Sequence, residues 1–463
     1  MKTGRFLTGS TMGHVVRMTA TGAFGITFVF LVDAANLVWL SQLGDPRLVA
    51  AVGFAFAIQF FSVSSGVGLM IACTALVSRS MGAGDRILAR EQAGAAVVTA
   101  AAIQGIVATF VIIFRHELTA LAGASGETAH LAARYLLFTM PSLVLMAVGM
   151  TCSGILRADG YGAKAMYVTL VSGAVLMLVD PVFILWLGWG LDGAAIGLNL
   201  FRLALMSLGL YFAVHQLGLV ARPTAESVMR RLVPYLAIAV PAIATQMATP
   251  VGNYLLTIVM APFGDDAVAA WAVVGRLTVV VFGGIFALSG AIGGIFGQNF
   301  GAGQLDRVRS TYLNALVFCL IYTALMWAVL VLATPAVVAL FGLSDQGSEV
   351  LWAFTTVGVG GFLFVGALFV TNAAFNNLGK PARSTLLNWL KEAVLGWPAA
   401  LVLAGAFGAA GVIYGQALAG AIVGTIACIW GWRFVRGLAS DHAERLDLPP
   451  MRPYPNIDRY RRR

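Results

Sequence analysis

The sequence predicts an all-α protein that crosses a membrane many times. Three observations lead to this fold class: 59% of the 463 residues are hydrophobic, only 11% are charged, and the mean hydropathy is +0.87. Soluble domains carry about a quarter charged residues, so this chain has too few charges to cover a surface in water. Transmembrane strands alternate polar and apolar residues, whereas the apolar runs here are continuous. The chain is therefore expected to form a polytopic helical bundle.

The apolar runs divide the chain into twelve expected spans, because roughly 20 apolar residues cross the hydrocarbon core. The spans are expected near 15–41, 49–78, 92–114, 131–155, 164–188, 191–217, 233–262, 267–298, 310–334, 349–377, 384–407 and 409–436. Only short glycine-containing turns separate the fifth span from the sixth and the eleventh from the twelfth. The basic stretch 438–463 is the only sizeable piece expected outside the membrane.

Positive charge indicates the orientation of the bundle, since Lys and Arg accumulate on the cytoplasmic side. With both termini in the cytoplasm, the outer loops and their edges hold only Arg47, Arg115 and Arg134 among the cations. The net charge of +9 is then a matter of topology, and nucleic acid is not an expected partner. The basic tail is expected to be attracted to anionic membrane lipid. The expected location is the inner membrane of a bacterium.

The two halves of the sequence repeat. Gly44 corresponds to Gly264, Gly82 to Gly301 and Gly160 to Gly379, each pair within a similar local sequence. The number of residues between the two glycines is almost the same for the three pairs. The separation from Gly82 to Gly301 is here called the repeat shift. Six spans separate the landmarks, so the halves share one orientation and an axis along the membrane normal relates them. Such repeats are typical of secondary transporters, so we expect an N-terminal lobe at 1–220, a C-terminal lobe at 221–437, and a small-molecule substrate.

The residues needed for other functions are missing from the sequence. The Gly-rich corner at 82–84 lacks the Lys-Ser/Thr pair and the preceding strand of a phosphate loop, so no nucleotide is expected. The four cysteines have no CxxC spacing, which argues against a metal site. No histidine lies in mid-span and no hydrolase motif occurs. We therefore expect neither an enzyme nor a cofactor, and an ion gradient as the energy source.

Several stretches, taken in order, resemble the multidrug and toxic compound extrusion (MATE) family. They are 36–44, 49–52, 78–85, 154–160, 179–181, 193–195 and 297–303, and the resemblance covers the chain except for its tail. It implies two six-helix lobes that form a V. It also implies export of cationic or amphiphilic small molecules in exchange for protons or sodium, by rocking of one lobe against the other.

Asp33, Asn36 and Asp180 are the candidate ion-coupling residues. Ionisable groups deep in a bilayer are costly and mark functional sites by default. Asp33 lies in the first span, Asn36 shares its helix face three residues later, and Asp180 precedes Pro181 in the fifth span. Burial favours the neutral form of a carboxyl group, so these acids could bind and release protons. Sodium bound by Asp33 and Asp180 is the alternative.

Asn199 and Arg202, in the sixth span, are expected to complete the same cluster. A permanent cation so close to the acids also supports a second interpretation. In that interpretation an Asp–Arg pair only links helices and does not move ions.

The sequence departs from the family pattern at several positions. The residue that usually carries the acid in the first helix corresponds to Asn36, with Asp33 one turn earlier, and a proline of that helix is missing. Family acids of the seventh and tenth helices correspond to Thr249 and Ala367. The pattern is more similar to the prokaryotic branch with acids in the N-lobe, which favours protons over sodium.

Polar residues in the C-lobe are candidates for lining a substrate cavity. They are Gln246, Asn253, Arg276, Asn372, Asn376 and Lys391. Lys391 and Glu392 are neighbours whose directions differ by about 100° on a helix, so they need not pair. Because Arg202, Arg276 and Lys391 are cations, an anionic substrate or a lipid-linked substrate moved by a flippase is the alternative function.

Overall fold

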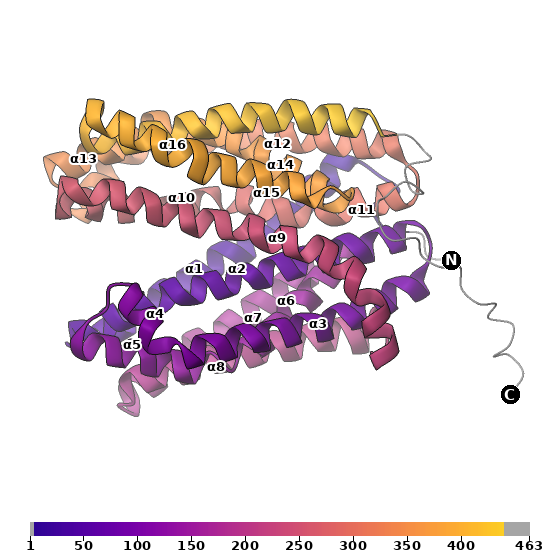
Figure 1. The fold of residues 1–463 in the computed structure, drawn as a ribbon, viewed down its shortest axis with the longest axis horizontal. Coiled ribbons are helices and arrows are strands. Elements are labelled where there is room, and N and C mark those ends of the chain that lie inside the picture. Colours follow the sequence, from indigo (N-terminus) through magenta and orange to yellow (C-terminus); the bar gives the residue numbers. More distant parts are fainter. Residues whose placement is uncertain (1–3, 439–463) are drawn as a thin grey trace, which may run out of the picture.

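The structure is a computed structural model that describes residues 4–438. It contains no strand in that range, and its helices follow the predicted spans (Figure 1). The predicted tail lies, apart from Leu438, outside the described residues.

The first half of the chain contains six spans. They are α1 (Thr11–Ser41), α2 (Pro46–Gly82), α3 (Arg86–Ile113), α5 with α6 (Gly126–Thr139, Leu143–Ala158), α7 with η1 (Gly162–Pro181, Val182–Trp186) and α8 with η2 (Gly190–Leu210, Tyr211–Gln216). A short helix, α4 (Arg115–Leu121), connects α3 to α5. The fourth span is bent by 55° between α5 and α6, a break that was not predicted.

The second half contains the other six spans. They are α9 (Ala225–Met260), α10 with α11 (Asp265–Ala291, Gly293–Gly301), α12 (Leu305–Phe341), α13 with η4 and α14 (Asp345–Ala353, Phe354–Gly358, Val359–Asn377), α15 with η5 (Pro381–Trp389, Leu390–Gly396), and α16 (Trp397–Arg436). A 3-10 turn, η3 (Ala261–Phe263), separates α9 from α10.

Gly408 divides the long helical stretch at the C-terminal end into two spans. The 56 residues from Pro381 to Arg436 would be about 84 Å long as one helix. Gly408 has φ 62° and ψ −148° inside α16, a conformation essentially restricted to glycine. Beyond it Gly415 packs closely on the backbone of Ala400, so the chain turns back. The twelve predicted spans are confirmed.

Glycines end equivalent helices in the two halves. Gly84 (φ 81°) and Gly303 (φ 70°) follow α2 and α11 in the left-handed region, where glycine carries no Cβ penalty. Asp85 then accepts a hydrogen bond from the backbone N–H of Leu88 and caps α3. The repeat shift found in the sequence thus also relates the backbone conformations of the two halves.

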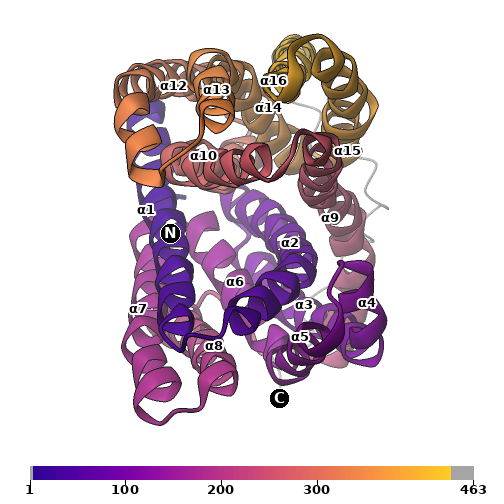
Figure 2. The same ribbon diagram turned by 90° about the vertical axis from the view of Figure 1, so that its left-hand side faces the viewer.

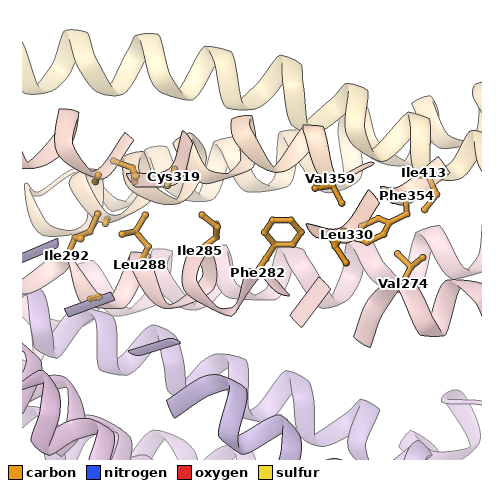
Figure 3. Packing of buried hydrophobic residues seen from close by; sticks show 14 of the residues in the cluster. Val274, Phe282, Ile285, Leu288, Ile292, Cys319, Leu330, Phe354, Val359 and Ile413 are labelled. Carbon is orange, nitrogen blue, oxygen red and sulfur yellow. The ribbon is translucent and has the colours of Figure 1, made fainter. Parts of the chain in front are cut away.

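The two lobes exchange contacts through their first helices. The main core of the C-lobe lies between α10, α12, α14 and α16 (Figure 3), and it also takes in Val15 and Met18 of α1. Conversely, the core of the N-lobe includes Tyr235 and Ile238 of α9, the first helix of the C-lobe. Lipid tails are as apolar as these side chains, so close packing rather than hydrophobicity holds such helices together. Gly68 of α2 accordingly lies directly against the backbone of Ile243 in α9.

One face of α2 is buried at one end of the molecule and exposed at the other. Near the end of α2, Ser78 and Gly82 contact Gly297 and Gln298 of the other lobe. With 3.6 residues per turn, the same face continues through residues that are all exposed: Phe61, Ala57, Gly53 and Ala50.

The opposing helix shows the same change at the same depth. Gly301, Gly297, Gly294 and Gly283 of α10 and α11 approach atoms of the N-lobe. The same face then reaches exposed residues that the repeat shift relates to the exposed residues of α2: Val280, Arg276, Ala272 and Ala269. The lobes therefore meet at one end, here called the closed end, and diverge at the other, the open end. Figure 2 looks onto the open end, with α2 and α10 facing each other between the lobes.

Candidate functional site

Asp180 lies where three helices of the N-lobe meet. The α-helical part of its span ends at Pro181, and a π-helical turn follows. Asn36 of α1 donates a hydrogen bond from Nδ2 to Asp180 Oδ2 over 2.6 Å. On the other side, Gly197 of α8 leaves room for Oδ1, which would overlap with any Cβ at that position. Proline at the end of one helix and glycine on the next thus create the space for a buried carboxylate.

The second oxygen of this carboxylate has no partner. Asp180 is 1% exposed, and its Oδ1 has no hydrogen bond from any described residue. An unpaired polar atom in such a place is costly. A proton on Oδ1 would remove the buried negative charge, and a cation beside Oδ1 would pair with it.

Asp33 is one turn from Asn36 on α1 and is partly buried. It lies close enough to Asp180 and to Arg202 for their charges to act on it. No described residue forms an ion pair with it. The structure therefore brings together Asp33, Asn36 and Asp180, as the sequence predicted, although their role in coupling stays a prediction.

Arg202 is almost fully buried, and its hydrogen-bond partners are residues other than the acids. Its Nη1 donates to the carbonyl oxygen of Thr139 (2.6 Å) and to Ser142 Oγ (3.0 Å), and its Nη2 donates to Gln59 Oε1 (3.3 Å). Thr139 is the last residue of α5. Since Pro141 cannot continue the helical hydrogen bonds, Arg202 supplies a donor for the interrupted end of α5.

Asn199 also forms hydrogen bonds at the break in the fourth span. Its Oδ1 accepts from Ser142 Oγ (2.6 Å), and its Nδ2 donates to the carbonyl oxygen of Phe138 (3.0 Å). The hydrogen bonds of the five expected residues therefore form two networks, one around Asp180 and one around Pro141, and Asp33 lies within reach of the charge of Arg202. Among the described residues Arg202 forms no ion pair with a carboxylate, so the alternative of a closed Asp–Arg pair is not what this structure contains.

Sequence reasoning missed Gln59, Ser142 and Thr139, which surround Arg202. Pro141, in the middle of a predicted span, was the feature of the sequence that could have indicated this group. A proline there leaves carbonyl groups without donors, and a buried arginine is well suited to bind them.

Lys391 and Glu392 form an ion pair inside the C-lobe. The sequence left open whether these neighbours pair, and in the structure they do. The helix turns in π geometry over Leu390–Gly396, and Glu392 is buried against Gly252 of α9. A buried carboxylate needs a compensating charge, and the adjacent lysine provides it.

The other expected cavity residues of the C-lobe are scattered. Asn372 is buried and its Oδ1 accepts from Asn388 Nδ2 (3.1 Å). Asn376 is buried at the closed end, Gln246 is partly buried, and Asn253 is exposed on α9.

Arg276 lies on the exposed face of α10 that is turned toward α2. Among the described residues no carboxylate forms an ion pair with it, and the exposed residues that α2 and α10 turn toward each other include no acid. Phe61 stands on the opposing face of α2 and is 41% exposed. The walls of the open half therefore combine one cation with aromatic surface.

No metal centre is formed by the part of the chain that the structure describes. No group of three or more His, Cys, Asp or Glu residues in that part could hold a metal ion. Cys73, Cys152, Cys319 and Cys428 are all free thiols.

Comparison with known proteins shows to which family this chain is related. The MatE family model matches residues 23–182 and 241–402. An FAD transporter of Shewanella oneidensis is 26% identical over 440 residues, covering 93% of this chain and 96% of that protein. The multidrug export protein MepA of Staphylococcus haemolyticus is 22% identical over 433 residues and 92% of each chain.

A solved structure has the same fold. It is described as the outward-facing conformation of a multidrug resistance MATE family transporter of the MOP superfamily. It superimposes with a TM-score of 0.87 at 21% identity, covering 94% of this chain and 99% of that one. The predicted arrangement of twelve helices in two lobes is confirmed.

Proposed function

Since this chain belongs to the MATE family of membrane efflux transporters, we propose that it is a secondary antiporter. It exports amphiphilic small molecules in exchange for protons, with sodium as the alternative coupling ion. The observation that most supports this proposal is the buried Asp180 carboxylate. One of its oxygens accepts a hydrogen bond from Asn36, and the other has no partner among the described residues. Such a group favours binding of a proton or a cation.

The proposed cycle connects this site to the divergence of the lobes. Most cations of the loops lie at the closed end, which supports a cytoplasmic position for that end and for both termini. The described conformation is then open to the outside. Ion binding at Asp33 and Asp180 from the outer side changes the packing of α1 against α7 and α8 and weakens the binding of substrate. Release of the ion into the cytoplasm restores the affinity for substrate.

Transport into proteoliposomes under imposed gradients tests this proposal. A proton gradient alone is expected to drive substrate movement in the wild-type protein, and a sodium gradient alone is not. The variants Asp33→Asn and Asp180→Asn should reduce gradient-driven transport to the background of empty vesicles while remaining monodisperse. Wild-type rates in both variants would remove the two acids from the mechanism.

A second candidate concerns the charge of the substrate. From its family resemblance the sequence favours cationic substrates, but Arg276 on the wall of the open half favours an anion. A relative of similar length is named an FAD transporter, and FAD combines phosphate groups with aromatic rings. Arg276 would pair with the phosphates, and Phe61 would offer a surface for the rings.

Binding of FAD and of a cationic dye to the purified protein distinguishes these candidates. With an anionic substrate, Arg276→Gln should weaken FAD binding about tenfold, the loss expected for one charge-assisted contact. Binding of the cationic dye should not weaken. If the wild-type protein binds the dye and not FAD, the anionic candidate is rejected.

A further inference from the structure

Arg79, at the end of α2, reaches across to the other lobe. Its Nε donates to the carbonyl oxygen of Asn377 over 2.7 Å, and its Nη2 donates to that of Asn376 over 3.2 Å. Both acceptors belong to the last turn of α14. Arg79 is 8% exposed, so this contact is removed from water.

Gln298, in the C-lobe, makes the equivalent contact in the opposite direction. Its Nε2 donates to the carbonyl oxygen of Ala158 over 2.6 Å, and Ala158 is the last residue of α6. The repeat shift takes Arg79 to Gln298, and it also takes Ala158 to Asn377. The two contacts are therefore counterparts in the internal repeat.

The chemistry of the acceptors explains why such contacts favour the closed arrangement. The last carbonyl groups of a helix have no partner within it, and the helix end carries partial negative charge. Arg79 forms no ion pair with any described carboxylate, and its Nη1 has no hydrogen-bond partner there. Its charge is thus stabilised by the end of α14, a partner that it has only while the lobes touch.

Glycines allow the backbones to come close enough for these bonds. A Cβ at Gly82 would overlap the backbone of Gln298, and one at Gly301 would overlap that of Arg79. These two glycines are the pair that defines the repeat shift, so the close approach is itself repeated.

The N-terminal segment joins the same contact region. The backbone N–H of Phe6 donates to Gln298 Oε1 over 3.0 Å, and Arg307 Nη2 donates to the carbonyl oxygen of Phe6 over 2.7 Å. Phe6 is 2% exposed and packs with the core of the C-lobe. One side chain, Gln298, thus connects the C-lobe both to α6 and to the start of the chain.

We propose that Arg79 and Gln298 form a reciprocal latch that holds the lobes together at the closed end. Both contacts must break for the lobes to separate there, and their strength sets the ratio of the two conformations. Arg79 contributes a charge and two bonds, whereas Gln298 contributes one bond to the opposite helix end. The latch is therefore asymmetric in strength although it is symmetric in position.

Distances between spin labels at the two ends test the latch without any need for substrate or ion. One label pair replaces Ile87 and Asp306, both exposed at the closed end on different lobes. The other pair replaces Ser125 and Asp345, both exposed at the open end. The variant Arg79→Ala should increase the population with a separated closed end about tenfold. The same molecules should show a shorter distance at the open end.

The size of the effect should follow the chemistry of each substitution. Gln298→Ala should shift the same populations in the same direction by a smaller factor, and Arg79→Lys, which keeps the charge, should be intermediate. Arg90→Gln changes an exposed arginine at the same end and should leave both distances unchanged. Loss of structure would broaden both distance distributions, whereas release of a latch moves them in opposite directions.

Unchanged distributions in Arg79→Ala and in the double variant Arg79→Ala/Gln298→Ala would overturn the proposal. If Arg79→Ala does not yield folded protein, the variants Arg79→Lys and Gln298→Ala test the proposal in its place. Wild-type distances in both of these milder variants would reject the latch as well.

Discussion

The two lobes have the same fold but different polar interiors. The repeat shift takes each polar residue of the N-lobe site to a small or apolar residue of the C-lobe. Asp33 becomes Gly252, Asn36 becomes Leu255, Asp180 becomes Ala399, Asn199 becomes Leu418 and Arg202 becomes Ala421. The polar site is thus a property of one lobe and not of the fold.

The C-lobe nevertheless has a buried carboxylate in a corresponding place. Glu392 packs against Gly252, the counterpart of Asp33, but it forms an ion pair with Lys391. In the N-lobe, Asp180 has only the neutral amide of Asn36 and one unpartnered oxygen. A carboxylate neutralised by its neighbour is part of the structure, whereas one without a counter-charge is free to bind an ion.

The largest difference between the lobes should appear in variants that remove one carboxylate. Glu392→Gln should lower the free energy of unfolding by about 3 kcal/mol, because Lys391 is then left unpaired in a buried place. The double variant Lys391→Met/Glu392→Gln should recover most of this loss. Asp180→Asn should not destabilise the protein, because no cation loses its partner. Thermal unfolding in detergent measures all three, and an equal loss in Asp180→Asn and Glu392→Gln would remove the distinction between the lobes.

The division of the N-lobe polar residues into two groups predicts a smaller effect at Arg202. Arg202→Met should cost about 2 kcal/mol of stability, because buried acceptors at the end of α5 lose their donor. Ion-coupled transport per folded molecule should persist, in contrast to Asp180→Asn. Loss of coupling at full stability in Arg202→Met would instead place this arginine in the ion site.

The smallest effect concerns the repeat itself. Gly84→Ala and Gly303→Ala should each cost about 1 kcal/mol, since both glycines have positive φ and Ala is disfavoured there. Equal shifts in the unfolding temperature are expected for the two. A large effect at one position alone would show that the two corners differ in their importance for stability.

The number of helices, the internal repeat and the residues around Asp180 could all be predicted from the sequence. Apolar length determines the spans, and a local motif that occurs twice reveals the repeat. The bend of the fourth span was not predicted, although Pro141 marks it, because proline is tolerated in membrane helices when other groups supply donors. Those donors, Arg202 and Asn199, come from a distant part of the chain. For this reason the hydrogen bonds of these two residues to the end of α5 could not be predicted from the sequence.

The same limit explains the Lys391–Glu392 pair and the contacts of Arg79. A π-helical turn and the burial of Glu392 against α9 depend on tertiary packing that periodicity does not contain. Arg79 lies in the stretch 78–85 that resembles the family, and the local sequence does not indicate its partners, whereas the structure gives it acceptors in the other half of the chain.

The central claim is that the N-lobe alone holds the coupling ion, and ion flux measured during substrate transport tests it most directly. Purified protein in liposomes, loaded with a pH-sensitive or a sodium-sensitive dye, is given a substrate gradient and no ion gradient. The wild-type protein and Lys391→Met/Glu392→Gln are expected to move ions against the direction of the substrate, and Asp180→Asn is expected to move none. Ion movement coupled to substrate in Asp180→Asn, or its loss in the C-lobe double variant alone, would contradict the account.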